Sequence, residues 1–409
     1  MSIEKCRNCE SPIKPFISFG QMPIANAFLS PKDFNKEFKY KLEVQFCERC
    51  KLVQLGDQPD REQMFHENYA FFSSTSKYMM NHFREFSDLV KDKYLKSSNS
   101  FVVEMGSNDG IMLRNFSDSG IKHLGIEPSS NVAEVARKNG VNTVCSFFDE
   151  SFAKNILKEY GHADAFLAAN VMCHIPYLHS VARGIKMLLK PNGVLIFEDP
   201  YLGDIIEKTS YDQIYDEHVF YFSVHSVSSL FECHGLEVID IQPQKTHGGS
   251  MRYILTHKNS IAKSQNVIDQ LKKEVDLGLN TSETYQKFRK NVENSRDTLK
   301  SVLEKLRSEK KRVVGYAATS KSTTVTNYCG ITPELVEFIS DTTPLKQGKF
   351  SPGAHIPVLS HDSFKSNYPD YALLFGWNHA KEIMEKEKDF IQSGGKWIVY
   401  VPRVEILES

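Results

Sequence analysis

The sequence predicts an α/β protein in which a small N-terminal metal-binding module precedes two Rossmann-like domains. Two Cys-x-x-Cys pairs fall within residues 1–67, which show no long helical periodicity. β-rich runs then alternate with amphipathic segments over 68–255, and the same alternation returns within 256–409. Strands separated by helical patterns are typical of a parallel sheet covered by helices.

The composition is that of an ordinary globular protein that is long enough for more than one domain. The chain has 409 residues, of which 41% are hydrophobic and 25% are charged. Because 50 Lys and Arg balance 51 Asp and Glu, no net charge indicates a nucleic-acid partner, and we expect none.

The sequence carries no pattern of a targeting or membrane segment. Met1–Cys6 lacks the apolar stretch of a secretory signal, and no run of about 18 apolar residues indicates a membrane span. We therefore expect a cytoplasmic monomer or homodimer without a membrane partner.

The first module, residues 1–67, contains four cysteines with the spacing of two zinc knuckles: Cys6, Cys9, Cys47 and Cys50. Four thiolates complete a tetrahedral zinc site and leave no position for water, so the expected Zn²⁺ is structural. The alternatives are reduced cysteines paired by chance and a redox pair. The redox alternative is weaker because neither pair opens a helix after a strand.

The second domain, residues 68–255, contains the strand-like runs 100–105, 123–127, 165–170 and 193–198 and the helix-like run 132–138. Its first strand leads into Gly106-Ser-Asn-Asp-Gly110, where glycines permit a tight turn and a close ligand. This is not the G-x-G-x-x-G of dinucleotide enzymes. The acidic Glu104 before the turn is unsuited to a pyrophosphate but suits the cationic groups of S-adenosylmethionine.

Further residues at the ends of the next strands complete the predicted cofactor site. Glu127 ends the second strand, where an acid can accept both ribose hydroxyls. We expect the third strand to end at Asp149, beside the adenine, and the fourth at Asn170. A purely structural turn is the alternative for the loop alone. The predicted cofactor residues are Glu104, Gly106, Ser107, Asn108, Asp109, Gly110, Glu127, Pro128, Phe148 and Asn170.

Titratable groups cluster in Tyr211–Tyr221, and His218 among them can serve as a base near neutral pH. Glu217 or Tyr215 could orient it or polarise a carbonyl, and His174 follows the fourth strand. A satisfied structural histidine is the alternative. We expect a lid over the cofactor to begin in 68–76, although its aromatics could equally be core. We interpret 246–252 as a hairpin turn.

The third domain, residues 256–409, is predicted to begin with helices over 260–311. Leu299, Val302, Leu303 and Leu306 recur at the spacing of an amphipathic helix, over too few heptads for a coiled coil. Strand-like runs follow at 312–318, 336–341, 371–376 and 396–401.

Together these motifs identify a family resemblance that spans essentially the whole chain. The chain resembles the three-domain sugar C-methyltransferases of deoxysugar biosynthesis, which act on nucleotide-linked 4-keto sugars. The motifs are the two cysteine pairs, Glu104-x-Gly-Ser-Asn-Asp-Gly110, Tyr215-Asp-Glu-His218, His247-Gly-Gly-Ser250, Gly315-Tyr-Ala-Ala-Thr-Ser-Lys321, Asn327-Tyr-Cys-Gly330, Asp341, Lys346-Gln-Gly348 and Pro352-Gly-x-His355-Ile-Pro357.

The resemblance implies a structural Zn²⁺, S-adenosylmethionine in the middle domain, and a C-terminal domain that helps to hold the nucleotide sugar. It also implies C3 of the sugar as methyl acceptor. It makes His218 the candidate base, with Tyr215 and Glu217 beside it and Tyr69 as the lid tyrosine. The implied substrate-binding residues are Tyr316, Thr319, Lys321, Asn327 and Arg252.

The chain departs from the family pattern at Ala317, Ser322 and Thr323, where glycines and a Gly-Asn pair are usual, and at Thr75 in the lid. These positions put the identity of the sugar and nucleotide in doubt and leave the cofactor prediction intact.

As a mechanism, we expect a 4-keto group to acidify the C3 proton and His218 to remove it. Tyr215 or His174 would then stabilise the enolate oxygen, and no metal takes part.

Three other functions compete with this interpretation. One is an O- or N-methyltransferase that acts on a sugar or polyketide, and another is a non-catalytic zinc-bearing scaffold that binds nucleotide sugar. A separate epimerase or reductase activity of the third domain is disfavoured because Gly315–Ser320 lacks the G-x-G-x-x-G pattern.

Overall fold

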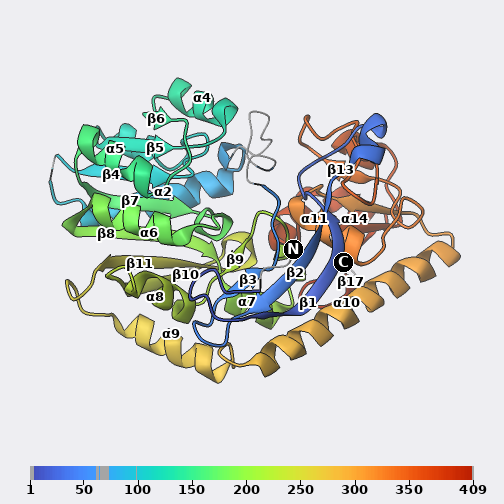
Figure 1. Ribbon diagram of the computed structural model, residues 1–409. Coiled ribbons are helices and arrows are strands. Elements are labelled where there is room, and N and C mark those ends of the chain that lie inside the picture. Colours follow the sequence, from blue (N-terminus) through green and yellow to red (C-terminus); the bar gives the residue numbers. More distant parts are fainter. Residues whose placement is uncertain (1–3, 61–63, 65–72, 98, 408–409) are drawn as a thin grey trace.

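The computed structural model describes residues 4–60, 64, 73–97 and 99–407, and the strands within these residues form three sheets (Figure 1). In Figure 1 the seven-stranded sheet and the six-stranded sheet lie on opposite sides, with the blue N-terminal strands between them. This architecture confirms the predicted α/β class.

The first sheet is antiparallel and has the order β1-β2-β3-β9. Three of its strands belong to the cysteine-containing segment, whereas the fourth comes from far along the chain and begins two residues after His218. The strands are β1 (Lys14–Pro23), β2 (Lys39–Phe46), β3 (Val53–Leu55) and β9 (Phe220–Tyr221). The fold therefore joins the metal-binding segment to the predicted catalytic segment.

The second sheet has the order β10-β11-β8-β7-β4-β5-β6. The five strands from β6 to β8 are parallel, as predicted, whereas β11 and β10 pair antiparallel as a hairpin. This hairpin confirms the interpretation of 246–252. The strands are β4 (Phe101–Met105), β5 (Lys122–Ile126), β6 (Thr143–Val144), β7 (Ala163–Ala169), β8 (Leu189–Pro200), β10 (Leu236–Gln244) and β11 (Ser250–His257).

The helices around this sheet cover both of its faces, which is why its central strands are buried on each side. They are α2 (Lys77–Tyr94), α3 (Arg114–Ser117), α4 (Ser130–Lys138), α5 (Glu150–Tyr160), α6 (Leu178–Leu188), α7 (Leu202–Lys208) and α8 (Val224–Glu232), with the short 3₁₀ helices η2 (Ser73–Thr75), η3 (Met172–His174), η4 (Tyr211–Gln213) and η5 (Thr246–Gly248).

The third sheet has the order β14-β13-β12-β15-β16-β17 and is parallel except for its last strand. Its strands are β12 (Val313–Tyr316), β13 (Ile339–Asp341), β14 (Val358–Ser360), β15 (Tyr371–Leu374), β16 (Lys396–Val399) and β17 (Glu405–Leu407). The remaining helices of the chain are α9 (Gln265–Asp276), α10 (Ser282–Ser308), α11 (Ser320–Tyr328), α12 (His361–Ser366), α13 (Ala380–Lys386) and α14 (Lys388–Gln392), with the 3₁₀ helices η1 (Pro31–Lys36) and η6 (Trp377–His379).

The predicted end of the third strand at Asp149 is wrong. The strand β6 ends at Val144, and Asp149 instead caps α5, where its Oδ1 accepts a hydrogen bond of 2.8 Å from the backbone N–H of Phe152. The apolar pair Phe147–Phe148 gives the sequence a strand-like appearance at this point, but a carboxylate before an amphipathic run is also a helix N-cap.

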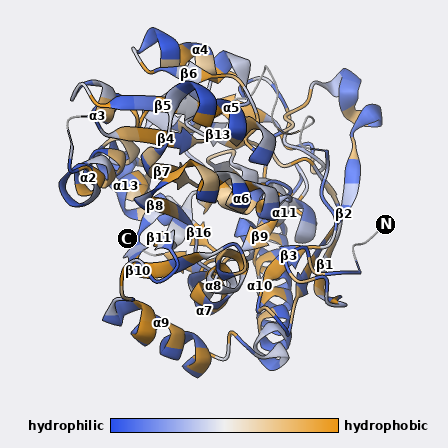
Figure 2. Ribbon diagram, turned by 60° about the vertical axis from the view of Figure 1, so that its left-hand side comes forward, coloured by the Kyte–Doolittle hydropathy of each residue, from blue (hydrophilic) through white to orange (hydrophobic). Residues whose placement is uncertain are grey.

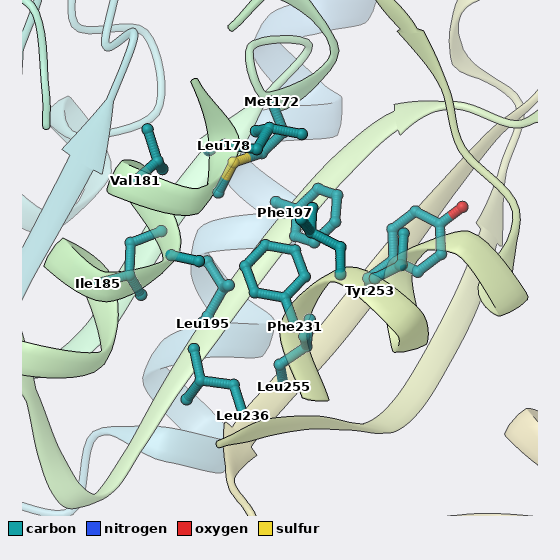
Figure 3. Packing of buried hydrophobic residues seen from close by; sticks show 14 of the residues in the cluster. Met172, Leu178, Val181, Ile185, Leu195, Phe197, Phe231, Leu236, Tyr253 and Leu255 are labelled. Carbon is teal, nitrogen blue, oxygen red and sulfur yellow. The ribbon is translucent and has the colours of Figure 1, made fainter. Parts of the chain in front are cut away.

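One core cluster fixes α6 and α8 against the same face of the second sheet (Figure 3). Phe197 of β8 lies at its centre, with ring centroids 4.8 Å from Tyr253 and 5.8 Å from Phe231 of α8. Val181 and Ile185 of α6 pack beside them. Burial of each such side chain stabilises the fold by roughly 1.5–3 kcal/mol, so the position of these helices is well determined.

The helices α9 and α10 carry the chain from the second sheet to the third. In Figure 2 their ribbons change between hydrophilic and hydrophobic colours, as expected of amphipathic helices with one face on the protein. Leu299, Leu303 and Leu306 of the predicted periodic run are buried, and Val302 packs partly buried beside them.

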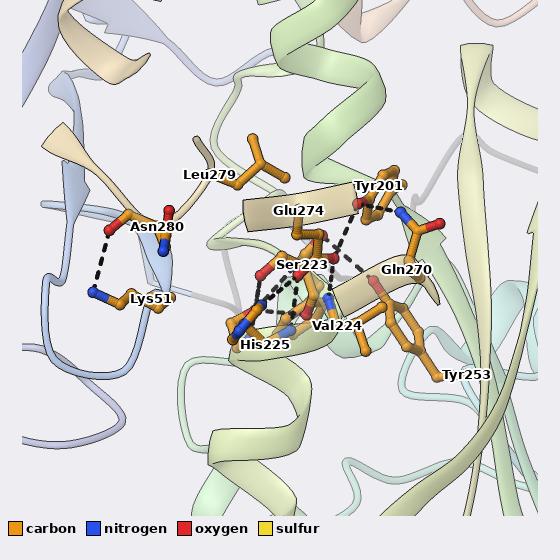
Figure 4. Close-up of polar contacts among 12 residues, drawn as sticks. Lys51, Tyr201, Ser223, Val224, His225, Tyr253, Gln270, Glu274, Leu279 and Asn280 are labelled. Carbon is orange, nitrogen blue, oxygen red and sulfur yellow. Dashed lines mark hydrogen bonds and ion pairs between the residues drawn. The ribbon is translucent and has the colours of Figure 1, made fainter. Parts of the chain in front are cut away.

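The buried carboxylate of Glu274 fastens α9 to the N-terminus of α8 (Figure 4). It accepts hydrogen bonds from the backbone N–H groups of Val224 and His225 at 2.6 and 3.0 Å and from the Tyr201 hydroxyl at 2.9 Å. A carboxylate at a helix N-terminus satisfies donors that would otherwise lack partners. Nearby, Lys51 Nζ donates to the Asn280 carbonyl at 3.2 Å, which ties the second cysteine pair to the start of α10.

Within the described part of the chain, no helix combines the length and the apolar character that a membrane span needs.

Candidate active site and zinc site

The two Cys-x-x-Cys pairs form two similar knuckles. In each, the N–H of the residue after the second cysteine donates to the carbonyl of the first at 2.9 Å, from Glu10 to Cys6 and from Lys51 to Cys47. Glu10 and Lys51 have positive φ angles of 57° and 60°, which close the turns. The local sequence thus folds each pair so that both thiols point to one side.

The four sulfur atoms have the arrangement that a tetrahedral ion needs. All four lie within 4.8 Å of one another, with 3.5 Å between Cys6 and Cys50 and 3.4 Å between Cys9 and Cys47. Zn–S bonds of about 2.3 Å correspond to sulfur separations of about 3.8 Å in a tetrahedron. None of these cysteines is disulfide-bonded, and three of them are buried. The donor set therefore fits a closed, structural Zn²⁺.

The glycine loop after β4 is held by the neighbouring strand β5. The N–H groups of Gly106 and Ser107 donate to the Ile126 carbonyl at 2.8 and 3.3 Å. Gly106 has a φ of +66°, and a Cβ at this position would lie 2.3 Å from a methyl carbon of Val171. Only glycine fits here, because a side chain would push away the segment that follows β7.

Carboxylates surround this loop. Glu127 accepts hydrogen bonds from the N–H groups of Asn108 and Ser129 at 3.0 and 2.9 Å, and burial raises its pKa. The pKa of Glu104 lies well above its usual value, first because of burial and then because Glu127 and Asp109 repel its negative charge. Such an environment favours a cationic partner that would compensate these charges.

A cavity of about 510 Å³ opens beside the loop. Six of the predicted cofactor residues line it: Gly106, Asn108, Glu127, Pro128, Phe148 and Asn170. The other four, Glu104, Ser107, Asp109 and Gly110, belong to the end of β4 and to the loop itself but do not line the cavity. Asp109, for example, accepts hydrogen bonds from the backbone and hydroxyl of Ser74 at 3.0 and 2.5 Å, which anchors η2 on the loop.

The residues on this wall fit S-adenosylmethionine. Gly106 leaves room where a Cβ would fill the space, and Glu127 stands at the end of β5. Among the described residues, the buried Oδ1 of Asn170 has no hydrogen-bond partner, so it can accept a ligand donor. Glu127, Asn170 and the loop backbone would hold the cofactor, with Phe148 forming an apolar wall.

His218 lies on the segment between η4 and β9, where it forms a hydrogen-bonded pair with Tyr215. Its Nδ1 lies 2.8 Å from the Gln213 carbonyl, so this nitrogen carries the proton and donates. Its Nε2 is then the acceptor for the Tyr215 hydroxyl at 2.8 Å. His218 is 2% exposed and lies behind the cavity wall, whereas Tyr215 and Glu217 are on the wall.

Two further histidines surround this pair. The rings of His174 and His218 are 5.2 Å apart, and both His174 and His247 line the cavity. The pKa of His218 lies well below its usual value, because of burial and then because of nearby His174. Burial lowers the pKa of His174 to about 3 and that of His247 to about 4. All three are therefore neutral at neutral pH.

The predicted catalytic segment is anchored by long-range contacts. The Asp216 carboxylate accepts from the Ala25 N–H at 2.9 Å, and Glu217 accepts from the Asn26 amide at 2.6 Å. The fully buried Asp212 accepts from Trp377 and Tyr400 at 2.6 and 2.9 Å. The N-terminal module and the C-terminal sheet thus both hold this segment in place.

The opposite wall of the cavity comes from the C-terminal sheet and carries two lysines. Lys321 Nζ donates to the Asn378 amide oxygen at 3.2 Å, and Lys346 Nζ donates to the Ala318 carbonyl at 2.8 Å. Burial lowers the pKa of both ammonium groups. Thr319 caps α11 on this wall by accepting from the Ser322 N–H at 3.2 Å.

Three predicted substrate residues do not line the cavity. Arg252 is buried and pairs with Glu198 at 2.9 Å inside the second sheet. Tyr316 donates its hydroxyl to Glu387 at 2.8 Å, and the Asn327 amide donates to the Thr323 and Pro352 carbonyls at 2.8 and 3.0 Å. We therefore retain only Thr319 and Lys321 as candidate substrate contacts.

The predicted lid residue Tyr69 lies outside the described residues, so its place relative to the cavity stays a prediction.

His247 and Lys346, which belong to the family motifs but carry no predicted role, also line the cavity. A possible signal for His247 is the Gly-Gly that follows it. His247 and Gly248 have φ angles of 54° and 90°, and a histidine with a positive φ is an uncommon residue.

Three known families match successive parts of the chain. Residues 6–65 match a family of zinc binding domains, residues 78–241 match the "Methyltransferase domain" family, and residues 245–402 match the "C-methyltransferase C-terminal domain" family.

Among individual proteins, the C-methyltransferase NovU of Streptomyces niveus is 32% identical over 410 residues, which cover 100% of this chain and 97% of NovU. Among solved structures, the PH0226 protein of Pyrococcus horikoshii has a TM-score of 0.36 at 15% identity, covering 46% of this chain and 95% of that chain. A methyltransferase of Thermotoga maritima has a TM-score of 0.33 at 21% identity, and the match covers 44% of this chain and 92% of that chain.

The full-length match to NovU and the C-methyltransferase C-terminal domain are consistent with the four-cysteine site and the glycine-loop cavity. The chain therefore belongs to the zinc-binding, S-adenosylmethionine-dependent C-methyltransferases.

Proposed function

We propose that this enzyme methylates C3 of a nucleotide-linked 4-keto deoxysugar and that His218 is the ultimate base. The observation that carries the proposal is the hydrogen bond of 2.8 Å between Tyr215 on the cavity wall and the neutral Nε2 of His218 behind it. This pair faces a cavity that the cofactor loop and the C-terminal sheet share.

Methylation at carbon requires an acidified C–H bond and a base. When bound, S-adenosylmethionine supplies an electrophilic methyl group on a sulfonium. A 4-keto group next to C3 makes the C3 proton removable, because the charge left behind spreads into an enolate. The chain must then accept the proton and stabilise the enolate oxygen.

The geometry supports a proton transfer through Tyr215. The phenol would pass its own proton to Nε2 of His218 and take the C3 proton in its place, so that the cation ends on the buried imidazole. The Gln213 carbonyl, 2.8 Å from Nδ1, fixes the tautomer that this transfer needs. His174, also on the wall, is a candidate donor to the enolate oxygen.

The two lysines of the opposite wall favour a substrate that carries an anionic group. Lys321 and Lys346 both face the cavity, and their lowered pKa values indicate ammonium groups that are poorly solvated. A diphosphate linked to the sugar would replace the lost solvation. A volume of about 510 Å³ lies within the range of roughly 300–1,000 Å³ that is common for ligand sites.

The proposal is tested by proton exchange at C3 and by the position of the new methyl group. Wild-type enzyme, His218→Asn and Tyr215→Phe would be incubated in deuterated water with S-adenosylmethionine and a panel of 4-keto deoxy nucleotide sugars, and products located by NMR. We expect C3 exchange and C3 methylation in wild type and loss of both in the variants.

His162→Asn, at an exposed histidine far along the chain from this segment, is the matched control and should behave as wild type. Normal exchange and methylation in His218→Asn would show that His218 is not the base. A methyl group found at another carbon would overturn the assignment of C3.

A further inference from the structure

A second group of soft ligands lies on α6 and in the turn that follows α8, away from the cavity. It consists of His179, Cys233 and His234, whose ligand atoms all lie within 4.8 Å of one another. The two histidines are half-buried and Cys233 is exposed, so an ion can reach the group from solvent. None of the three residues lines the cavity or contributes to the proposed reaction.

The fold holds the backbone of this group in place. Core residues of α6 and α8 pack together on one face of the second sheet (Figure 3), and His179 and Cys233 follow directly in sequence on Leu178 and Glu232. The turn that ends α8 is fixed as well, because the N–H of His234 donates to the Phe231 carbonyl at 3.0 Å and Gly235 has a φ of +74°.

The imidazole of His179 is already oriented as a metal ligand would be. Its Nε2 lies 2.8 Å from the backbone carbonyl of Asn8, so this nitrogen carries the proton and donates. Its Nδ1 therefore carries no proton, and the lone pair of this nitrogen is directed at His234 Nε2, which lies 2.7 Å away. Metal-binding histidines commonly donate their second N–H to a backbone carbonyl in this way.

We propose that His179 Nδ1, His234 Nε2 and Cys233 Sγ bind one Zn²⁺ or similar transition-metal ion, with the fourth position open to solvent. One thiolate and two imidazoles are a zinc-type donor set, and the absence of oxygen ligands among the three disfavours Ca²⁺ and Mg²⁺. Binding would release the Cys233 thiol proton, and His234 would move its remaining proton to Nδ1.

Binding of an ion by these three residues would need only small movements of their side chains. Zn–N bonds of about 2.0–2.1 Å require the two nitrogens to separate to about 3.3 Å in a tetrahedron, from the 2.7 Å observed. The Cys233 thiol now donates to the Leu230 carbonyl at 3.0 Å and would turn towards the ion. Arg183 and Lys186 are nearby cations that oppose a bound ion, and the pairing of Arg183 with Glu150 at 2.6 Å reduces the repulsion from Arg183.

Such an ion would strengthen the attachment of the N-terminal module. Asn8, which accepts the hydrogen bond from His179, lies between the zinc ligands Cys6 and Cys9, and its amide also donates to Ser229 of α8 at 3.4 Å. The second ion would therefore fasten α6 and α8 to the first zinc knuckle. This inference is independent of the substrate that we propose.

The test is metal binding by the full-length protein with its four-cysteine zinc in place. Zinc content would be measured first, and Co²⁺ would then be titrated as a probe, because thiolate-bound Co²⁺ gives a charge-transfer absorption band. We expect wild type to bind one further ion per chain with this band. Cys233→Ser should lose the band, and His234→Gln should weaken Co²⁺ binding at least about tenfold, because each removes one of three ligands.

The matched control is Cys145→Ser, which removes an exposed cysteine elsewhere and should bind Co²⁺ as wild type does. Thermal unfolding gives a second measurement, since Zn²⁺ should raise Tm in wild type and Cys145→Ser but not in Cys233→Ser. Two results would overturn the proposal. One is a titration that ends at a single ion per chain, and the other is loss of the second ion in Cys173→Ser instead, which would place it in the buried Cys173–His174–His218 group.

Discussion

Tyr215 is the residue through which the proposed proton transfer would pass, because its hydroxyl separates the cavity from His218. Tyr215→Phe keeps the ring and removes this hydroxyl. We expect kcat to fall about 10²-fold while the Kd of S-adenosylmethionine stays within a factor of two, since proton transfer contributes about 10²–10⁴-fold to rates. Steady-state kinetics and calorimetric titration measure the two quantities. Equal kcat values would contradict the relay.

Buried neutral histidines should also affect stability in acid. The pKa of His174 is lowered to about 3 in the folded protein, whereas an unfolded histidine titrates near 6.5. Below about pH 6.5 the unfolded chain therefore binds a proton that the folded chain does not. This lowers the free energy of unfolding by about 1.4 kcal/mol per pH unit until the folded pKa is reached.

His174→Gln removes this one contribution. Relative to wild type, the variant should gain about 2 kcal/mol between pH 6.5 and pH 5, whatever its stability at neutral pH. Urea unfolding at both pH values measures the difference. The exposed His162→Gln should show no such gain, and an identical pH dependence in wild type and His174→Gln would contradict a neutral, buried His174.

At the scale of elements, the loop between β4 and α3 depends on close contact with the segment after β7. A Cβ at Gly106 would meet Val171 at 2.3 Å, and Val171 directly follows the cavity residue Asn170. We expect Gly106→Ala to weaken S-adenosylmethionine binding at least tenfold, because both backbone strain and this contact distort the wall. Calorimetric titration measures the Kd.

Gly120→Ala is the matched control. Gly120 also has a positive φ, of +68°, but nothing lies within 4 Å of a Cβ there, so only backbone strain would be added. Its Kd should equal that of wild type. If both variants weakened binding equally, the contact with Val171 would not be the cause.

The capping of α8 by Glu274 should be important for the attachment of α9 to α8. Glu274→Ala would leave the buried N–H groups of Val224 and His225 without partners, which costs about 2–3 kcal/mol in the free energy of unfolding. Urea denaturation measures this loss. Glu293→Ala, which removes an exposed pair with Arg289, should change stability by less than about 0.5 kcal/mol. Similar losses in both variants would argue against the cap.

Local patterns explain which parts of the site could be predicted from sequence. The cysteine knuckles and the loop from Glu104 to Gly110 each consist of neighbouring residues, so their spacing alone indicates their chemistry. Arg252 could not be placed in this way. It sits opposite Glu198 because of the register between β11 and β8, which one sequence does not reveal, and the ion pair keeps it from the cavity.

For the whole molecule, the same limit applies to the contacts between distant segments. Nothing in the local sequence predicts that β9, which begins two residues after His218, would complete the sheet of the zinc-binding segment, or that Asn26 would donate to Glu217. These contacts join residues more than 160 positions apart. They show that the zinc-binding segment supports the proposed catalytic segment as well as its own small core.

Loss of the four-cysteine zinc should therefore lower catalysis more than cofactor binding. Without the ion, β3 would lose its support, and so would β9 and the contacts from Ala25 and Asn26 to Asp216 and Glu217. The glycine loop, in contrast, is held by β5. For Cys47→Ser/Cys50→Ser we expect kcat to fall at least about tenfold, because misplaced catalytic groups lose rate steeply.

The Kd of S-adenosylmethionine should change less than about threefold in this variant, since its wall keeps its own strand contacts. Zinc content, kcat and Kd would be measured on the same preparations, with Cys145→Ser as the control that retains zinc and activity. A variant without zinc that kept the wild-type kcat would show that the segment from Tyr215 to β9 is positioned independently of the ion. Parallel losses of kcat and cofactor affinity would instead indicate that the whole fold, and not this one sheet, depends on zinc.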